Sequence, residues 1–270
     1  MTTRVAVAGA TGKLGRVVAE LVEAAEGYEL VARLDSRSEL AEMIGADVVV
    51  DVTVPGVSQG VVDFAISQGI QVLVGTSGWS QERISALEST LAGRDDTGVI
   101  IIPNFSIGSV LGTALSTIAG RFFDSIEIVE GHSASKIDSP SGTAVRTAEL
   151  IGLARDERGP VIAPHTDQRA RGQQVASIPV HSLRLAGLIA KQDVIFGGTG
   201  ETLTISHTTF SSSSYEQGIL LALDAVRDAR GVTVGLDKLL NLGIGEAPDV
   251  ASRDTSLPGS SLPDDGTAAE

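Results

Sequence analysis

The stretch that decides the fold is RVAVAGATGKLG, residues 4–15. Its first half is apolar, short and closed by glycine, which is typical of a buried strand, and apolar residues then recur at helical spacing over residues 14–25. Gly9 permits a tight turn, Gly12 lets a pyrophosphate approach the backbone, and Gly15 lets the helix pack closely on the sheet. The stretch therefore predicts a strand, a turn and a helix N-terminus that hold the phosphates of a dinucleotide.

The glycine spacing is G-x-x-G-x-x-G and not the commoner G-x-G-x-x-G, so glycines that serve turn geometry alone are an alternative. Asp35 ends the next expected strand, where an acid binds ribose hydroxyls; a solvated acid at a strand end is the alternative. An Asp here favours NADH over NADPH because a 2′-phosphate would meet a like charge. Lys13, Arg33 and Arg37 lie close enough in sequence to leave the use of both open.

Strands and helices alternate up to residue 106. We expect strands over 4–10, 28–35, 47–53, 70–78 and 99–104, and helices over 14–25, 57–67 and 80–91, the last with Ser80 as its N-cap. This alternation predicts an α/β fold whose N-terminal part, residues 1–106, is a Rossmann-type, doubly wound parallel sheet. A ligand would lie at the carboxyl edge of that sheet, which carries Thr53, 75–78 and 103–105.

The pattern changes after Asn104. We expect a helix over 107–121, a strand over 125–132, a helix over 142–154, a long loop over 155–177, and three consecutive antiparallel strands over 178–185, 191–197 and 201–210. These segments predict a second domain of α+β type over 107–215. The helix and closing segment of 216–245 are expected to return to the first domain. Residues 246–270, with six acids, one Arg and three Pro, predict a disordered acidic tail.

Composition excludes several classes of function. The 270 residues carry 20 basic and 34 acidic side chains, which argues against a nucleic-acid surface but permits a local site for an anion. The absence of Cys excludes disulfides, thiolate metal sites and cysteine catalysis, and we expect no metal. Apolar runs stay below the ~20 residues that span a membrane, and the N-terminal one is too short for a signal peptide. We expect a cytoplasmic protein that binds neither nucleic acid nor membrane.

A second group of polar residues stands in GHSASKIDSPSGTA, residues 131–144. His132 ends an expected strand, Lys136 adds a positive charge, and a helix begins at Gly142 and Thr143, whose free N–H groups can hold a carboxylate. A solvated lysine and an ordinary histidine at a strand end are the alternatives. Together the residues predict a site for a carboxylate-bearing substrate with proton donors beside it.

Five stretches also carry a resemblance: GATGKLG (9–15), VGTSGW (74–79), PNFSIG (103–108), EGHSASKIDSPSGTA (130–144) and VHSLRLAGLIAKQDVIFGGTGETLTISH (180–207). In this order they resemble the 4-hydroxy-tetrahydrodipicolinate reductase (dihydrodipicolinate reductase) family of diaminopimelate–lysine biosynthesis. The resemblance implies a homotetramer whose 107–215 domain binds substrate and forms the oligomer. It also implies that NADH or NADPH reduces a conjugated imine of a small anionic dicarboxylate, 4-hydroxy-tetrahydrodipicolinate, to tetrahydrodipicolinate.

The resemblance assigns roles by position. His132 matches the catalytic histidine and Lys136 the lysine that donates the proton. The substrate contacts it implies are Ser133, Ser141, Gly142 and Thr143. The cofactor contacts it implies are Gly9, Ala10, Thr11, Gly12, Lys13, Leu14, Asp35, Gly75, Thr76, Ser77, Ile102, Pro103, Asn104 and Phe105.

Three positions depart from the family pattern. Ser133 and Ser135 stand where the family has histidines, and Ser212 where it commonly has an arginine. A serine donates a hydrogen bond but carries no charge. His181 and Arg184 either face the site or are ordinary residues of a strand face. The alternatives for the function are a related Rossmann reductase acting on another imine or keto acid, and a nucleotide-binding sensor without catalysis.

Overall fold

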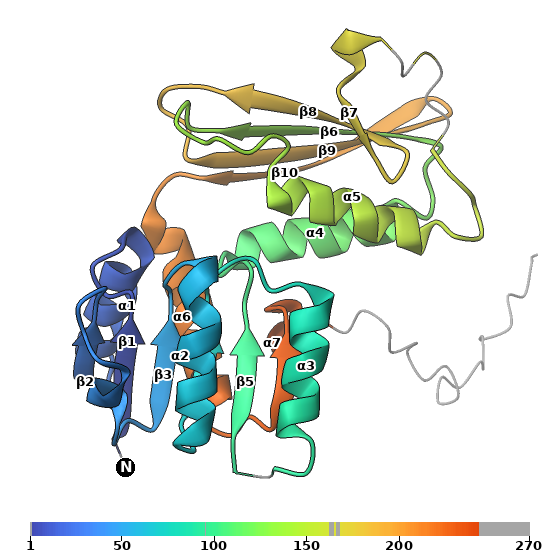
Figure 1. Cartoon of the computed structure of the whole chain (residues 1–270). Coiled ribbons are helices and arrows are strands. Elements are labelled where there is room, and N and C mark those ends of the chain that lie inside the picture. The colour runs from blue at the N-terminus through green and yellow to red at the C-terminus, as the bar shows by residue number, and fades with distance from the viewer. Residues whose placement is uncertain (1, 95, 162–164, 166–167, 243–270) are drawn as a thin grey trace, which may run out of the picture. The chain divides into compact units, whose positions relative to one another are not determined.

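The computed structural model describes residues 2–94, 96–161, 165 and 168–242 (Figure 1). The elements below belong to one structural unit, residues 1–240. The predicted acidic tail, 246–270, lies outside the described residues.

Six strands form a sheet, called sheet A, in which every pairing is parallel. In the order β11-β5-β4-β3-β1-β2 they are β11 (Gly231–Val234), β5 (Gly98–Ile101), β4 (Gln71–Val74), β3 (Val48–Asp51), β1 (Thr3–Ala8) and β2 (Tyr28–Leu34). The parallel sheet and its first five strands were predicted. The sixth, β11, comes from the closing segment, where four partly exposed residues at the sheet edge are too short a pattern to indicate a strand.

Helices cover both faces of sheet A, as the alternation predicts. They are α1 (Lys13–Ala24), α2 (Pro55–Ser67), α3 (Gln81–Leu91) and α6 (Glu216–Val226), with α7 (Asp237–Leu240) and the short 3-10 helix η1 (Leu40–Met43) beside them. One core cluster joins the sheet to α2 and α3, and the other joins it to α1 and α6. Ser80 caps α3, its hydroxyl accepting from the Arg83 N–H at 3.4 Å, as predicted.

The topological switch point of sheet A lies at β1, which pairs with β2 on one side and β3 on the other. Gly9 follows β1 with φ +86°, and a Cβ on it would lie 2.6 Å from the Val52 carbonyl oxygen. A Cβ on Gly15 would lie 2.1 Å from the Gly9 carbonyl oxygen. These glycines are required by close backbone approach at the switch point, where open α/β sheets bind their ligands.

Five strands form a second, mixed sheet, called sheet B. In the order β10-β9-β6-β8-β7 they are β10 (Glu201–Thr209), β9 (Ala190–Gly198), β6 (Ser125–His132), β8 (Ile178–Arg184) and β7 (Gln173–Val175). The helices α4 (Ile107–Ala119) and α5 (Gly142–Ala154) lie along one face of it (Figure 1). Two short 3-10 helices, η2 (Arg169–Arg171) and η3 (Ser212–Tyr215), precede β7 and α6.

The prediction of three consecutive antiparallel strands was wrong. Only β9 and β10 pair in that way; β6 lies between β8 and β9, parallel to β8 and antiparallel to β9. Strand alternation gives the face of each side chain but not the neighbouring strand, so the sequence pattern could not reveal the insertion. The prediction of 155–177 as a loop was also incomplete, because it contains η2 and β7.

The inserted β6 has a consequence for the site. The connection from β8 to β9 passes the end of β6, where the Leu185 N–H donates to the His132 carbonyl at 3.0 Å. A Cβ on Gly131 would lie 3.0 Å from Leu188, a residue of the same connection. The order of sheet B therefore brings the 185–189 segment against the motif histidine.

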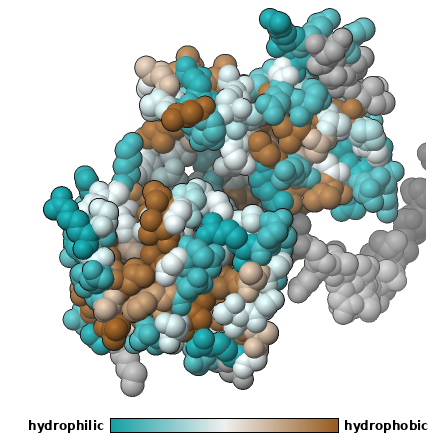
Figure 2. All heavy atoms as spheres, viewed as in Figure 1, coloured by the Kyte–Doolittle hydropathy of each residue, from teal (hydrophilic) through white to brown (hydrophobic). Residues whose placement is uncertain are grey.

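Within the described residues, no helix combines the length and the apolar character needed to cross a membrane. In Figure 2 hydrophilic side chains cover much of the face in view, broken by separate hydrophobic areas. The large apolar side chains gather instead in the clusters on the two faces of sheet A and in a third between sheet B and its helices.

Candidate active site

A cavity of about 710 Å³ joins the carboxyl edge of sheet A to the end of β6 in sheet B. It collects residues that the sequence predicts for two different tasks. Those predicted for the cofactor are Lys13, Leu14, Gly75, Pro103, Asn104 and Phe105; those predicted for catalysis or substrate are His132, Ser133, Lys136, Ser141 and Thr143. The two constellations found separately in the sequence thus share one cavity.

The other predicted residues do not line this cavity. They are Gly9, Ala10, Thr11, Gly12, Asp35, Thr76, Ser77, Ile102 and Gly142. Ala10, Thr76 and Ile102 are buried. Their roles remain predictions.

The turn from β1 into α1 fits a pyrophosphate. Gly12 is the N-cap of α1 and supplies no side-chain hydrogen bond to the helix, which leaves first-turn N–H groups for an anion. A Cβ at Gly9 or Gly15 would clash with backbone atoms of this turn or of its neighbour, as described above. Residues of this chain therefore fit a dinucleotide, with Asp35 following the neighbouring strand β2.

The surroundings of Asp35 bear on which nicotinamide cofactor the protein prefers. Arg33 is paired with Glu23 at 2.6 Å, which holds its guanidinium in another interaction. The carboxylate of Asp35 accepts from the backbone N–H of Arg37 at 2.8 Å. An exposed carboxylate held in this way suits ribose hydroxyls better than a phosphate.

A buried carboxylate that sequence reasoning missed organises the sheet edge. Asp51 ends β3 and accepts from the hydroxyls of Thr53, at 2.6 Å, and of Ser58. The Ser58 hydroxyl in turn accepts from the indole N–H of Trp79 at 3.0 Å. The network ties the loop after β4, which contains the predicted 75–77 contacts, to β3 and α2.

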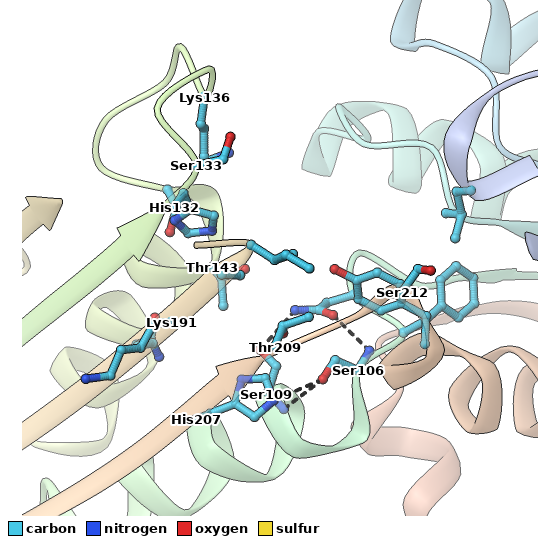
Figure 3. A pocket seen from close by; sticks show the side chains of 18 of the residues that line it. Ser106, Ser109, His132, Ser133, Lys136, Thr143, Lys191, His207, Thr209 and Ser212 are labelled. Atoms are coloured by element: carbon cyan, nitrogen blue, oxygen red, sulfur yellow. Dashed lines mark hydrogen bonds between the residues drawn. The ribbon is translucent and has the colours of Figure 1, made fainter. Parts of the chain in front are cut away.

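His132 and Lys136 lie on the same wall of the cavity, with Ser133 and Thr143 beside them (Figure 3). The Nδ1 atom of His132 lies 2.6 Å from the carboxylate of Glu130, so its Nε2 atom is free of that contact. The Nζ atom of Lys136 lies 2.8 Å from Asp138 Oδ1, and this hydrogen bond lowers the pKa of the Asp138 carboxyl. The pair can supply protons to a bound molecule.

The carboxylate-binding part of the prediction depends on the start of α5. The helix begins at Gly142 as predicted, and the Ser141 hydroxyl caps it by accepting from the Ala144 N–H at 3.3 Å. Ser141 and Thr143 both line the cavity. A helix N-terminus that opens onto the cavity favours a negative charge there.

Sequence reasoning missed a second group of lining residues: Ser106, Ser109, Leu188, Ile189, Lys191, Gln192, His207, Thr209 and Tyr215. His207 lies 3.3 Å from the Ser106 hydroxyl, and burial lowers the pKa of its imidazole, which keeps the ring neutral at pH 7. Several of these residues stand on β9 and β10, where strand alternation gives no sign of a cavity. The sequence signal for them was the inclusion of some of these residues in the family-like stretches 103–108 and 180–207.

Two of the three serines that depart from the family pattern line the cavity. Ser133 and Ser212 line it, and the hydroxyls of Ser133 and Ser135 lie 2.7 Å apart. Serine presents a neutral hydroxyl at these positions, whereas arginine carries a positive charge and histidine gains one when it is protonated. Among the residues that the structure describes, no group of three or more His, Asp or Glu could hold a metal ion.

His181 and Arg184, which the sequence left open, do not line the cavity. His181 pairs with Glu127 at 2.5 Å. Arg184 binds the carboxylate of Glu130, at 2.9 Å to Oε1 and 3.1 Å to Oε2. Arg184 therefore reaches His132 only through Glu130.

We expect the stability of the protein to depend on pH through the Glu130 carboxyl. Burial raises its pKa, but hydrogen bonds from Arg184, Ser182 and His132 outweigh burial, and the net pKa lies below the ordinary value of 4.5. A lowered native pKa contributes stability above pH 4.5 that is lost as the pH falls through the native pKa. The free energy of unfolding of the native protein, measured with urea between pH 7 and pH 3.5, should fall more steeply than that of Glu130→Gln. Parallel curves would contradict this.

Comparison with known proteins agrees with the geometry. The family model "Dihydrodipicolinate reductase, N-terminus" matches residues 3–105, and "Dihydrodipicolinate reductase, C-terminus" matches residues 108–240. The chain belongs to the dihydrodipicolinate reductase family. It is therefore an NAD(P)H-dependent reductase with a Rossmann-type sheet and a C-terminal mixed sheet, as the resemblance implied.

Individual relatives cover almost the whole chain. The 4-hydroxy-tetrahydrodipicolinate reductase of Clavibacter michiganensis is 66% identical over 90% of this chain and 87% of its own length. The reductase of the same name from Streptomyces griseus is 45% identical over 88% and 98%. A solved dipicolinate-bound dihydrodipicolinate reductase from Paenisporosarcina sp. TG-14 is 30% identical, with a TM-score of 0.77 over 88% of this chain and 99% of that one.

Proposed function

We propose that this reductase converts 4-hydroxy-tetrahydrodipicolinate to tetrahydrodipicolinate in diaminopimelate and lysine biosynthesis. The observation that supports the proposal is the shared cavity, which is lined by His132, Lys136 and the start of α5 and by residues at the carboxyl edge of sheet A. The dicarboxylate named for the relative from Paenisporosarcina is of the expected substrate class.

Bound NAD(P)H supplies a hydride. The residues of this chain have three tasks around it. Thr143 and the first turn of α5 would hold one substrate carboxylate and so orient the ring. The 4-hydroxyl group of the substrate must leave as water, which gives a conjugated imine. Hydride addition to that imine leaves an electron-rich enamine carbon, to which Lys136 would donate a proton with the help of His132. The charge of Lys136 also offsets that of a dianionic substrate.

A second candidate is reduction of another imine or keto acid by the same machinery. The neutral hydroxyls of Ser133 and Ser212 favour it, because they offer a dicarboxylate less positive charge than histidine and arginine would. A sensor without catalysis accounts less well for a lysine and a histidine in one cavity.

The deciding experiment is a coupled assay. Purified protein would be mixed with NADH or NADPH and with substrate generated in place by the synthase that precedes this step, and absorbance followed at 340 nm. Turnover with this substrate, and much slower turnover with simple keto acids, would support the proposal. Nucleotide binding without turnover would contradict it and favour the second candidate.

Asp35 should decide cofactor preference. In Asp35→Ala we expect KM for NADH to rise by about 10- to 100-fold, since a charged hydrogen bond to a ribose hydroxyl is worth roughly 1.5–3 kcal/mol, while KM for NADPH falls or stays constant. Steady-state kinetics with both cofactors measure the change. An unchanged ratio of the two kcat/KM values would show that Asp35 does not contact the ribose. Asp63→Ala, on an exposed face of α2, is the matched control.

We also propose that the enzyme is a homotetramer that acts in the cytoplasm, where reduced nicotinamide nucleotides are available. The family resemblance supports the tetramer. Light scattering coupled to size exclusion would give about four times 27.8 kDa if this is right, and the mass of a monomer or dimer if it is wrong.

A further inference from the structure

Glu130 is a buried carboxylate that contacts His132, a residue of the cavity wall. Its side chain is fully buried on β6, yet it has a full set of donors around its carboxylate. His132 Nδ1 lies at 2.6 Å, both terminal nitrogens of Arg184 bind it, and the backbone N–H of Ser141 donates to it at 3.3 Å. A buried carboxylate is stable only when it is paired and hydrogen-bonded in this way.

The register of sheet B creates this arrangement. Glu130 and His132 are two residues apart on β6, so both side chains point to the same face. In the parallel pairing with β8, His132 stands opposite Arg184. The pairing brings the Arg184 guanidinium to the Glu130 carboxylate, and its planar fork makes a bidentate contact with it.

Arg184 extends the arrangement to the loop that carries Lys136. One of its terminal nitrogens also donates to the Asp138 carbonyl at 2.6 Å. The carboxylate of Asp138 is paired with the ammonium of Lys136, with 2.8 Å between Oδ1 and Nζ. The pair of Glu130 and Arg184 therefore contacts the histidine, the N-cap of α5 and the lysine loop.

We propose that Glu130 and Arg184 are positioning residues, which hold His132 with its proton on Nδ1 and its Nε2 atom directed to the substrate. A carboxylate that accepts the Nδ1–H selects this tautomer and fixes the plane of the ring. Arg184 binds both the Glu130 carboxylate and the Asp138 carbonyl, and so fixes the lysine loop relative to His132. The inference rests on the proposed function, because it assigns the pair a role through His132.

The chain offers a matched control on the same strand. Glu127 is also bound by an arginine, Arg171, and by a histidine, His181, at 2.5 Å. None of these three residues lines the cavity. Glu127→Gln removes the same charge from a cluster of the same residue types that does not touch the cavity, although Glu127 is partly exposed and Glu130 is buried. Urea unfolding of both variants therefore accompanies the kinetics.

Kinetics provide the first test. In Glu130→Gln we expect kcat to fall about 10- to 100-fold with KM for NADH unchanged, and in Glu127→Gln we expect kcat within about twofold of the native value. In a His132→Ala background, Glu130→Gln should lower kcat by less than about threefold, because the group it positions is gone. Equal losses in both backgrounds would overturn the proposal. Arg184→Lys, which keeps the charge but not the fork, should lie between the native protein and Glu130→Gln.

A second test needs no turnover. The chain has four histidines, and ¹⁵N spectra of their ring nitrogens, with His132→Gln for assignment, report which nitrogen of His132 carries the proton. We expect the Nδ1–H form in the native protein and a loss of that preference in Glu130→Gln. An Nε2–H form in the native protein would overturn the proposal. If the native protein does not turn over the proposed substrate, the proposed function fails while these spectra still decide the positioning role.

Discussion

Replacing Lys136 with Ala is expected to lower kcat by about 10²- to 10⁴-fold, the range that a positioned general acid contributes. Lys136 lines the cavity beside His132, and its ammonium is held at 2.8 Å from Asp138. Loss of the side chain removes the predicted proton donor and a positive charge that a dianionic substrate needs. The coupled assay at 340 nm measures kcat and KM for both substrate and cofactor.

Two further variants separate these effects. Lys136→Arg keeps the charge but holds its protons at any accessible pH, so it should restore KM for the substrate more than kcat. Lys238→Ala removes an exposed lysine of α7 and should change neither constant. A kcat of Lys136→Ala within about threefold of the native value would show that another group donates the proton.

Gly15→Ala is expected to have the second large effect, on nucleotide binding and on stability. The added Cβ would lie 2.1 Å from the Gly9 carbonyl oxygen and 2.9 Å from the Ala10 Cα, both backbone atoms, so α1 must move away from the β1 turn. Overpacking of this kind costs about 1–3 kcal/mol in the free energy of unfolding. Because the moved helix carries the N–H groups predicted to hold the pyrophosphate, we expect the Kd for NADH to rise at least about tenfold.

The matched control is Gly60→Ala in α2, since a Cβ at Gly60 meets nothing within 4 Å. Alanine is the better helix former by roughly 1 kcal/mol, so this variant should be as stable as the native protein or more so, with unchanged NADH binding. Urea unfolding and fluorescence titration with NADH measure both quantities. Native NADH affinity in Gly15→Ala would contradict a phosphate site at this turn.

The sequence by itself determined the parallel sheet, the glycine turn and the start of α5. Each of these depends on residues close together in the chain: an apolar run that ends in Gly9, helical spacing after Gly12, and Ser141 before a helix. Local backbone requirements of this kind leave a direct trace in the residue order. The substrate site around His132 and Lys136 could be predicted for the same reason, because its residues are close together in the chain.

Only the tertiary structure decided which residues surround that stretch. The insertion of β6 between β8 and β9 brings Arg184 to Glu130 and brings His207 and Lys191 to the cavity. These partners lie more than 50 residues beyond His132 along the chain, and strand alternation carries no information about which strand is the neighbour. The predicted proton donors could therefore be found in the sequence, whereas the contacts that Glu130 and Arg184 make around them depend on the order and register of sheet B.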